Sequence, residues 1–290
     1  MRLLKREGPG DFRLTPKLSD KNIPPYAILS HTWGGDEDEV TFEDLEQGIG
    51  RNKTGFQKIE FCGEQAARDK LEYFWVDTCC IKKTSDAEVA FSLNSMFRWY
   101  HNATKCYVYL SDFSARIEEN LREAAFRNSR WFTRGWTLPE LLAPESVEFF
   151  SKEGILLGSK VSLKEYIMDI TGIPVQAFLG DFRMYSSQER ISWINGRETE
   201  AKEDIIYCLL GICDVFMPII YGEGEENALR RLQQEISSLQ RNKDKGEESY
   251  SKYLEARARD GACWNCGSRD HWESQCRRPL CGKCEGFSKR

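Results

Sequence analysis

The sequence predicts an α/β layer fold in its first half, followed by a mostly helical second half. Short runs rich in aromatic and branched residues have the composition of strands buried in a parallel sheet. These runs are Tyr26–Ser30, Tyr73–Val76, Cys106–Leu110 and Val147–Phe150. Between them, apolar residues at spacings of three and four predict helices over residues 56–66 and 88–100. Alternation of strands and helices is typical of an α/β sheet covered by helices.

Beyond Phe150 the apolar pattern becomes helical, with no clear strands. Helices are expected over residues 163–170, 187–196, 204–212 and 226–239. Residues 240–260 are polar and charged, as in a solvated helix or a linker. The expected organisation is a large domain over 1–237, a charged linker over 238–260, and a cysteine-rich module over 261–278. Residues 279–290 are expected to be an incomplete second knuckle or a tail.

Composition points to a protein with a substantial core and no membrane span. The 290 residues are 40% hydrophobic and 30% charged. No run approaches the roughly 18 consecutive apolar residues of a membrane-spanning helix. The N-terminal residues 1–6 contain too short an apolar stretch for a signal peptide. We therefore expect an intracellular protein, either cytoplasmic or nuclear.

The eleven cysteines are unevenly distributed. Thiols of intracellular proteins stay reduced or bind metal, so disulfides are not expected. Six cysteines are scattered through apolar runs and are expected to pack as small hydrophobic residues, namely Cys62, Cys79, Cys80, Cys106, Cys208 and Cys213. The other five fall within residues 263–284. Residues 241–290 also carry 12 basic and 8 acidic side chains, so this part of the chain can approach a polyanion.

The spacing C-x2-C-x4-H-x4-C near the C-terminus predicts a metal site. Its ligands are Cys263, Cys266, His271 and Cys276. Three thiolates and one imidazole complete the tetrahedral shell that Zn2+ prefers and leave no open position, which makes the site structural. The segment is too short to bury a core, so zinc must supply its folding energy.

Residues 263–276 resemble the CCHC zinc knuckle. The resemblance implies binding of single-stranded RNA or DNA by base stacking on exposed aromatic residues, here Trp264 and Trp272. The cations that can meet phosphates are Arg269, Arg277 and Arg278. Alternatively, the tryptophans cover a very small core or contact another protein. Cys281 and Cys284 begin a second knuckle that lacks its later ligands, and no metal is assigned to them.

Several strings in residues 26–235 together resemble the fungal heterokaryon-incompatibility (HET) domain. They are Tyr26–Gly34, Trp75–Ile81, Asn94–Tyr100, Cys106–Asp112, Ser129–Pro144, Glu203–Gly211 and Met217–Gly224. The resemblance implies a protein that triggers cell death when unlike fungal individuals fuse. Lys82 and Phe91 depart from a pattern in which family members often carry acidic or amide residues.

The resemblance also implies a fold similar to Toll/interleukin-receptor (TIR) domains, with a flavodoxin-like parallel sheet. Trp136–Leu141 is similar to the Trp-Cys-x-x-Glu-Leu string of TIR domains, in which NAD-cleaving members use the glutamate. That comparison makes Glu140 the candidate catalytic residue and NAD the candidate substrate. Alternatively, Glu140 follows Pro139 at a helix start, where a carboxylate favours the N-terminal dipole.

Further candidate pocket residues follow the predicted strands. Ligands of open α/β sheets bind outside the carboxyl ends of the strands, where Ser30, His31, Trp33 and Asp77 are expected. Trp136 is the fifth candidate. His31 can equally be a packed histidine, and Asp77 can cap the next helix.

Three functions follow from these patterns. The first is a self-associating module of non-self recognition that triggers cell death, with the knuckle as a tether for nucleic acid. The second is a NAD glycohydrolase that uses Glu140. The third is a nucleic-acid-binding adaptor whose HET domain is a scaffold.

Overall fold

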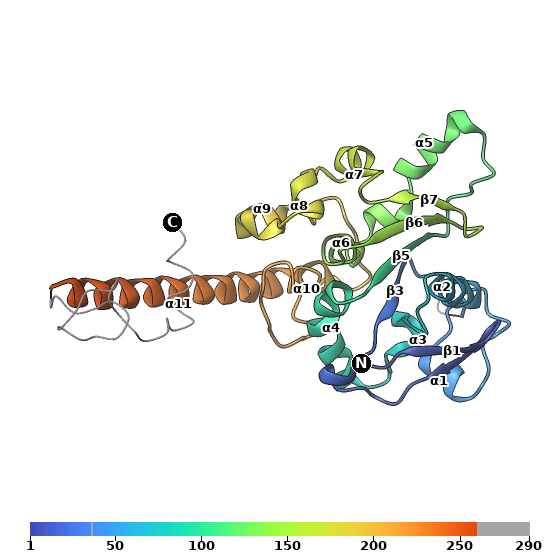
Figure 1. Cartoon of the computed structure of the whole chain (residues 1–290), viewed down its shortest axis with the longest axis horizontal. Coiled ribbons are helices and arrows are strands. Elements are labelled where there is room, and N and C mark those ends of the chain that lie inside the picture. Colours follow the sequence, from blue (N-terminus) through green and yellow to red (C-terminus); the bar gives the residue numbers. More distant parts are fainter. Residues whose placement is uncertain (36, 260–290) are drawn as a thin grey trace, which may run out of the picture. The chain divides into compact units, whose positions relative to one another are not determined.

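The computed structural model describes residues 1–35 and 37–259, and side chains up to residue 242 (Figure 1). The chain divides into two units, Met1–Glu235 and Ile236–Arg290. In the second unit, the described residues continue the helix α11 (Glu225–Arg259). Among the described residues, no helix is both long and apolar enough to cross a membrane.

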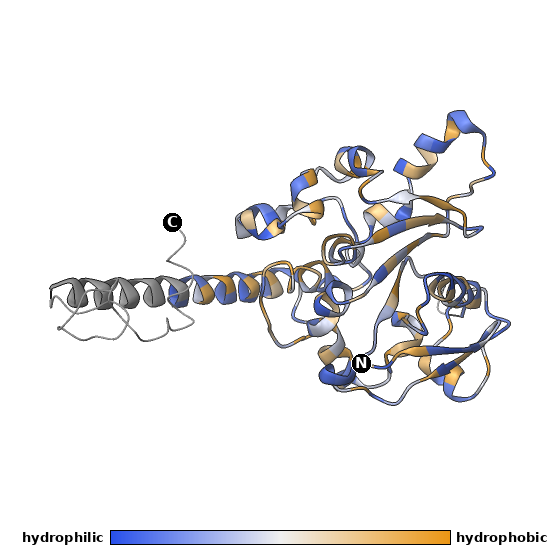
Figure 2. Ribbon diagram, viewed as in Figure 1, coloured by the Kyte–Doolittle hydropathy of each residue, from blue (hydrophilic) through white to orange (hydrophobic). Residues whose placement is uncertain are grey.

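Within the described residues, one seven-stranded sheet has the order β2-β1-β4-β3-β5-β6-β7. Its four central strands are parallel, and they are β3 (Tyr26–His31), β4 (Tyr73–Trp75), β5 (Lys105–Leu110) and β6 (Val147–Ser151). All six residues of β3 are buried, and Figure 2 shows hydrophobic residues along the central strands. The prediction of an α/β fold with a parallel central sheet is confirmed.

Helices α2 (Phe56–Arg68) and α4 (Asp86–His101) connect the first three parallel strands. The chain moves in one direction from β3 to β4 and in the other from β4 to β5. Because such crossovers are right-handed, this reversal places α2 and α4 on opposite faces of the sheet, as Figure 1 shows. The helix α2 approaches the sheet so closely that a Cβ on Gly63 would lie 2.5 Å from the Phe12 ring.

Antiparallel strands flank the parallel core on both edges. On one side β1 (Leu4–Gly8) pairs with β4 and with β2 (Asp11–Leu14). On the other side β7 (Leu156–Ser159) pairs with β6. The expectation of no strand beyond Phe150 is therefore wrong. Edge strands are often short and half exposed, so they lack the continuous apolar run that marks a buried strand. The four residues of β7 are exposed or half-buried, and Leu156 is exposed.

Short helices make up most of the second half. The chain continues through α5 (Glu119–Arg127), α6 (Thr137–Leu142), α7 (Lys164–Thr171), α8 (Val175–Leu179), α9 (Ser187–Ser192) and α10 (Asp204–Tyr207). Single-turn 3-10 helices lie at Asp20–Asn22, Arg130–Thr133 and Phe182–Met184, and the short helices α1 (Phe42–Glu46) and α3 (Asp77–Cys80) precede α4. The helix expected over 204–212 is thus only its first turn, because the chain continues from Cys208 in turns.

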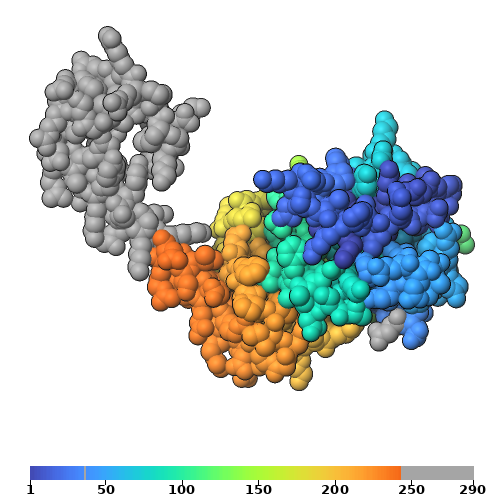
Figure 3. Space-filling view, turned by 90° about the horizontal axis from the view of Figure 1, so that it is seen from below, coloured from blue at the N-terminus to red at the C-terminus, as the bar shows by residue number. Residues whose placement is uncertain are grey.

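Contacts of α4 and α6 assemble the region that carries the candidate site. The helix α6 packs against β3 and α4. The side-chain amide of Asn94 in α4 donates to the Met217 carbonyl oxygen (3.1 Å) and holds the segment that leads to α11. In Figure 3, α4 lies between the N-terminal segment and the chain around residues 200–235. Sequence segments that are far apart therefore meet at one end of β3.

Candidate functional site

A cavity of about 310 Å3 opens at the carboxyl ends of β3 and β4. Its lining comes from the turns after these strands, from α4 and α6, and from the chain between residues 200 and 221. The lining residues are His31, Thr32, Trp33, Asp77, Ile81, Lys83, Val89, Ser92, Leu93, Met96, Arg134, Trp136, Thr137, Glu140, Glu200, Asp204 and Tyr221. This position agrees with the rule that ligands of open α/β sheets bind beyond the carboxyl ends of the strands.

The first wall of the cavity, here called the sheet wall, consists of His31, Trp33, Asp77 and Lys83. Val76 follows β4, and the next residue, Asp77, begins α3. The Asp77 carboxylate contacts two neighbouring side chains, those of His31 and Trp33. His31 Nε2 lies 2.9 Å from Asp77 Oδ1, and Trp33 Nε1 donates to Asp77 Oδ2 (2.8 Å). The Lys83 ammonium group lies 3.2 Å from the centroid of the Trp33 ring. The indole of Trp33 is thus fixed by an acid and a cation.

Asp77 carries its negative charge in this wall. Burial alone would raise its pKa, but hydrogen bonds from His31 and Trp33 and the charges of His31 and Lys83 outweigh burial. Together they lower the pKa of Asp77 from 3.8 to about 2. Loss of hydration lowers the pKa of Lys83, and the negative charge of Asp77 opposes that change.

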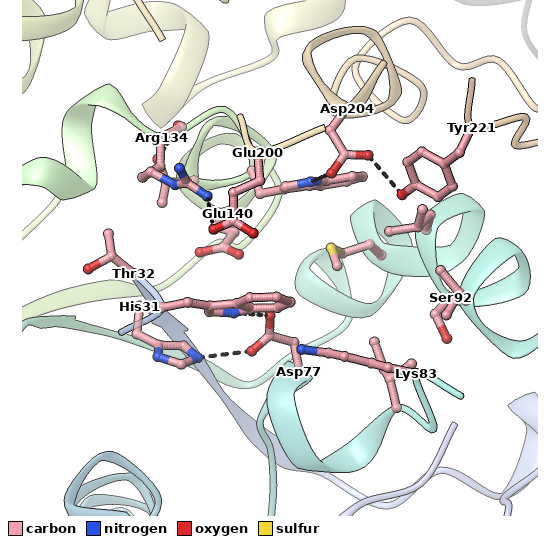
Figure 4. Close-up of a pocket in the computed structure, with 17 residues that line it drawn as sticks. His31, Thr32, Asp77, Lys83, Ser92, Arg134, Glu140, Glu200, Asp204 and Tyr221 are labelled. Carbon is pink, nitrogen blue, oxygen red and sulfur yellow. Dashed lines mark hydrogen bonds and ion pairs between the residues drawn. The ribbon is translucent and has the colours of Figure 1, made fainter. Parts of the chain in front are cut away.

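The second wall, here called the helical wall, consists of Arg134, Trp136, Glu140, Glu200, Asp204 and Tyr221. Asp204 of α10 accepts hydrogen bonds from Trp136 Nε1 (3.0 Å) and from the Tyr221 hydroxyl (2.9 Å). Arg134 forms an ion pair with Glu200 (3.2 Å). In Figure 4, Asp77 and Asp204 lie on opposite sides of the pocket, with Glu140 between them.

Glu140 is 5% exposed and lies on α6. Its carboxyl group accepts a hydrogen bond from the Ser30 hydroxyl on β3, and Ser30 Oγ in turn accepts from Trp131 Nε1 (2.8 Å). Burial raises the pKa of Glu140 well above 4.5, and the negative charge of Asp77 acts in the same direction. The Ser30 hydrogen bond and the positive charge of Arg197 oppose the rise. The surroundings of Glu140 therefore favour the protonated acid.

The helix-capping interpretation of Glu140 accounts for only part of its surroundings. Glu140 does lie in the first turn of α6, but the helix begins at Thr137 and its N-cap residue, Trp136, makes no side-chain cap bond. The carboxyl group instead contacts Ser30 across the sheet–helix interface. The chain thus holds a buried acid against the cavity.

The sequence-predicted residues His31, Trp33, Asp77, Trp136 and Glu140 all line the cavity. Ser30 lies behind Glu140, as its hydrogen-bond donor. Sequence reasoning did not assign Lys83, Arg134, Glu200, Asp204 or Tyr221 to this site. Asp204 and Tyr221 lie within two of the strings that resemble HET domains, which was the available signal for them.

The predicted metal and nucleic-acid residues lie outside the described residues. They are Cys263, Cys266, His271 and Cys276 for zinc, and Trp264, Trp272, Arg269, Arg277 and Arg278 for nucleic acid. Within the part of the chain that the structure describes, no group of three or more His, Cys, Asp and Glu side chains can hold a metal ion.

Two comparisons with known proteins support the identification of a HET domain. Residues 26–125 match the model of the family described as heterokaryon incompatibility protein (HET). The chain is also similar to the vegetative incompatibility protein HET-E-1 of Podospora anserina, with 50% identity over 241 residues. That alignment covers 81% of this chain and 18% of the relative. No solved structure matches. Both matches support a HET domain of the heterokaryon-incompatibility type in this chain.

Proposed function

We propose that this chain acts in heterokaryon incompatibility, and that its HET domain acts by hydrolysing the bond between nicotinamide and ribose in NAD. The observation that carries the enzymatic part is Glu140, a buried acid that Ser30 holds in the helical wall of the cavity. The incompatibility part rests on the HET family match and on the similarity to HET-E-1.

The size of the cavity suits one half of a dinucleotide. Ligand pockets commonly enclose about 300–1,000 Å3, and this cavity of about 310 Å3 lies at the lower end. It therefore accommodates a nucleoside-sized group, while the remainder of NAD extends from the opening. Trp33 and Trp136 offer aromatic surface to a flat ring, and each indole is held by an aspartate.

The electrostatics suit a cationic ring. The lining contains four carboxyl groups, on Asp77, Glu140, Glu200 and Asp204, against the two basic side chains of Lys83 and Arg134. Oxidised nicotinamide carries a positive charge, which favours the ionised form of a nearby carboxyl group. Binding of the ring would thus lower the pKa of Glu140 and convert it to the carboxylate that catalysis needs.

In the proposed reaction, the bond between the nicotinamide nitrogen and ribose C1′ breaks, and its electron pair goes to the ring. Nicotinamide leaves as a neutral molecule, and positive charge develops on the ribose as in glycoside hydrolysis. The Glu140 carboxylate stabilises that charge in a site sheltered from water. Water then adds to C1′ and releases one proton, so the products are nicotinamide and ADP-ribose.

The fold gives this proposal independent support. The order β4-β3-β5-β6 corresponds to strands 2-1-3-4 of a flavodoxin-like sheet, which is the core expected for a TIR-like domain. In such sheets the ligand lies where the strand order reverses, which here is between β3 and β5. The cavity begins at the end of β3, one of these two strands, with His31 and Trp33.

The test is nicotinamide release by the purified full chain at high protein concentration, since self-association is part of the proposal. We expect Glu140→Gln to reduce release by at least about 100-fold, the usual cost of losing a charge-stabilising group. The isosteric amide can still accept from Ser30, so circular dichroism should be unchanged. Glu145→Gln, an exposed control on the same segment, should stay within about twofold of the wild type. No release by the wild type, or equal release by Glu140→Gln, would overturn the enzymatic part.

In the same proposal, residues 261–278 form a zinc knuckle that tethers the HET domain to single-stranded RNA or DNA. The support is the spacing of Cys263, Cys266, His271 and Cys276, which provides a closed tetrahedral shell. A chain that binds nucleic acid normally but releases no nicotinamide would instead be the adaptor with a HET scaffold.

A further inference from the structure

Within the described part of the chain, Lys83 is the basic side chain of the cavity lining that forms no direct ion pair with a carboxylate, although the negative charge of Asp77 acts on it through space. The other basic residue of the lining, Arg134, is paired with Glu200. The contact described for the Lys83 ammonium group is with the face of the Trp33 indole, at 3.2 Å from the ring centroid. A cation held by an aromatic ring keeps its capacity to bind an anion.

Two helices of the fold fix the position of the Lys83 backbone. It lies in the short turn between α3 and α4, two residues before the N-cap residue Ser85. Two residues before Lys83, Ile81 is buried and lines the same cavity. The backbone of Lys83 is thus fixed, while its four-carbon stem lets the ammonium group move.

We propose that Lys83 binds the phosphate attached to the ribose of a ligand whose ring contacts Trp33, so that the cavity selects nucleotides over nucleosides. This inference rests on the proposed function and adds to it the chemical class of the bound half: a nucleoside monophosphate unit. Carboxyl groups dominate the rest of the lining and would repel a phosphate. The placement of the phosphate therefore depends on this cation.

Transfer of the Lys83 ammonium group from the Trp33 ring to a phosphate is favourable on physical grounds. The Trp33 ring offers the ammonium group no hydrogen-bond acceptor, whereas a phosphate accepts hydrogen bonds from several of its three N–H donors. A phosphate within reach of Lys83 would therefore draw the ammonium group to its oxygens. The Trp33 ring holds the lysine near that position, which limits the loss of side-chain entropy on binding.

The experiment measures binding by calorimetry, with two probes that differ by one phosphate: nicotinamide mononucleotide and nicotinamide riboside. The full chain carries Glu140→Gln, so that neither probe is consumed. We expect the mononucleotide to bind at least about 10-fold more tightly than the riboside, and Lys83→Met to abolish the difference. Binding of the riboside should stay within about twofold, and Lys83→Arg should restore part of the preference.

Lys82→Met is the matched control. The Lys82 ammonium group lies 5.4 Å from the centroid of the Phe42 ring, and the residue does not line the cavity. It removes one positive charge at the neighbouring position, so a general charge effect would appear in both variants. We expect Lys82→Met to keep the preference for the mononucleotide.

The outcomes separate this inference from the proposed function. Equal affinity of both probes for the Lys83-containing chain overturns the inference and leaves the nicotinamide site standing. Equal weakening of both probes by Lys83→Met overturns it as well, because Lys83 would then only support Trp33. Absence of binding of both probes, to the wild-type chain as well as to Glu140→Gln, overturns both proposals.

Discussion

The sheet wall and the helical wall of the cavity each hold a tryptophan through an aspartate, Trp33 through Asp77 and Trp136 through Asp204. The neighbours of the two acids differ. Asp77 has His31 and Lys83 beside it, and its pKa falls to about 2. Burial raises the pKa of Asp204, and the negative charges of Glu203 and Glu200 act in the same direction.

Both aspartates accept the same hydrogen bond from an indole N–H, yet their pKa values shift in opposite directions. This contact therefore does not decide whether the acid is ionised. The surrounding charges decide it. The result is a cavity with a fixed negative charge on one wall and two protonatable acids, Glu140 and Asp204, on the other. Environments that separate the pKa values of nearby acids are typical of sites that assign them different roles.

Removing the charge from each aspartate would test this comparison most strongly. In Asp77→Asn, the amide oxygen can accept from Trp33, but its NH2 group meets His31 Nε2. The variant also removes the negative charge of the sheet wall, which attracts the cationic ring of NAD in the proposed function. Loss of one contact to a charged group costs about 2 kcal/mol, so we expect nicotinamide release to fall by roughly 30-fold.

Asp204→Asn should have a smaller effect than Asp77→Asn. The amide oxygen still accepts from Trp136 Nε1, and the Tyr221 hydroxyl can turn to accept from the amide NH2. We expect less than about fivefold loss of nicotinamide release, measured in the same assay. Equal losses in the two variants would show that the ionised state of Asp77 has no special importance.

The acids Asp77 and Glu140, one from each wall, should change the stability of the protein with pH in opposite directions. For Asp77, the folded pKa of about 2 lies below the unfolded value of 3.8. Its stabilisation is present above pH 3.8 and is lost as pH falls toward about 2, with a total of about 2 kcal/mol. For Glu140, the folded pKa lies well above 4.5. Its contribution is fully present below pH 4.5 and declines as pH rises above that value.

Urea unfolding from about pH 3 to about pH 7 measures both slopes. Asp77→Asn should lose stability relative to the wild type above pH 3.8, and the gap should narrow in acid. The stability of Glu140→Gln relative to the wild type should be highest at high pH. Ionisation of buried Glu140 destabilises the wild type there, and the variant lacks this carboxyl group. Parallel curves for all three proteins would contradict the opposite ionisation of Asp77 and Glu140.

The sheet wall could be predicted from sequence better than the helical wall, for a physical reason. The strands β3, β4, β5 and β6 are mostly buried and rich in apolar residues, so their carboxyl ends can be located. His31 and Asp77 follow from that location. The edge strands β2 and β7 are half exposed and leave no such run.

The helical wall depends on packing between distant segments. Asp204 reaches Trp136, and Tyr221 reaches Asp204, only because α10 and the chain before α11 fold back onto the region of α6. No local periodicity encodes that return. The string around Glu140 identified one acid of this wall through its resemblance to TIR domains, while its contact with Ser30 came only from the fold.

The smallest expected effect on the cavity comes from the cysteine-rich segment, outside the described residues. In Cys263→Ser, the predicted shell loses one of its three thiolates, and we expect loss of about one zinc ion per chain by metal analysis. Binding of single-stranded RNA should weaken, because the knuckle has no other source of folding energy. Nicotinamide release should stay within about twofold, since the cavity is built from residues 31–221. Unchanged zinc content would reject the predicted ligand set, and a large fall in nicotinamide release would show that the two segments act together.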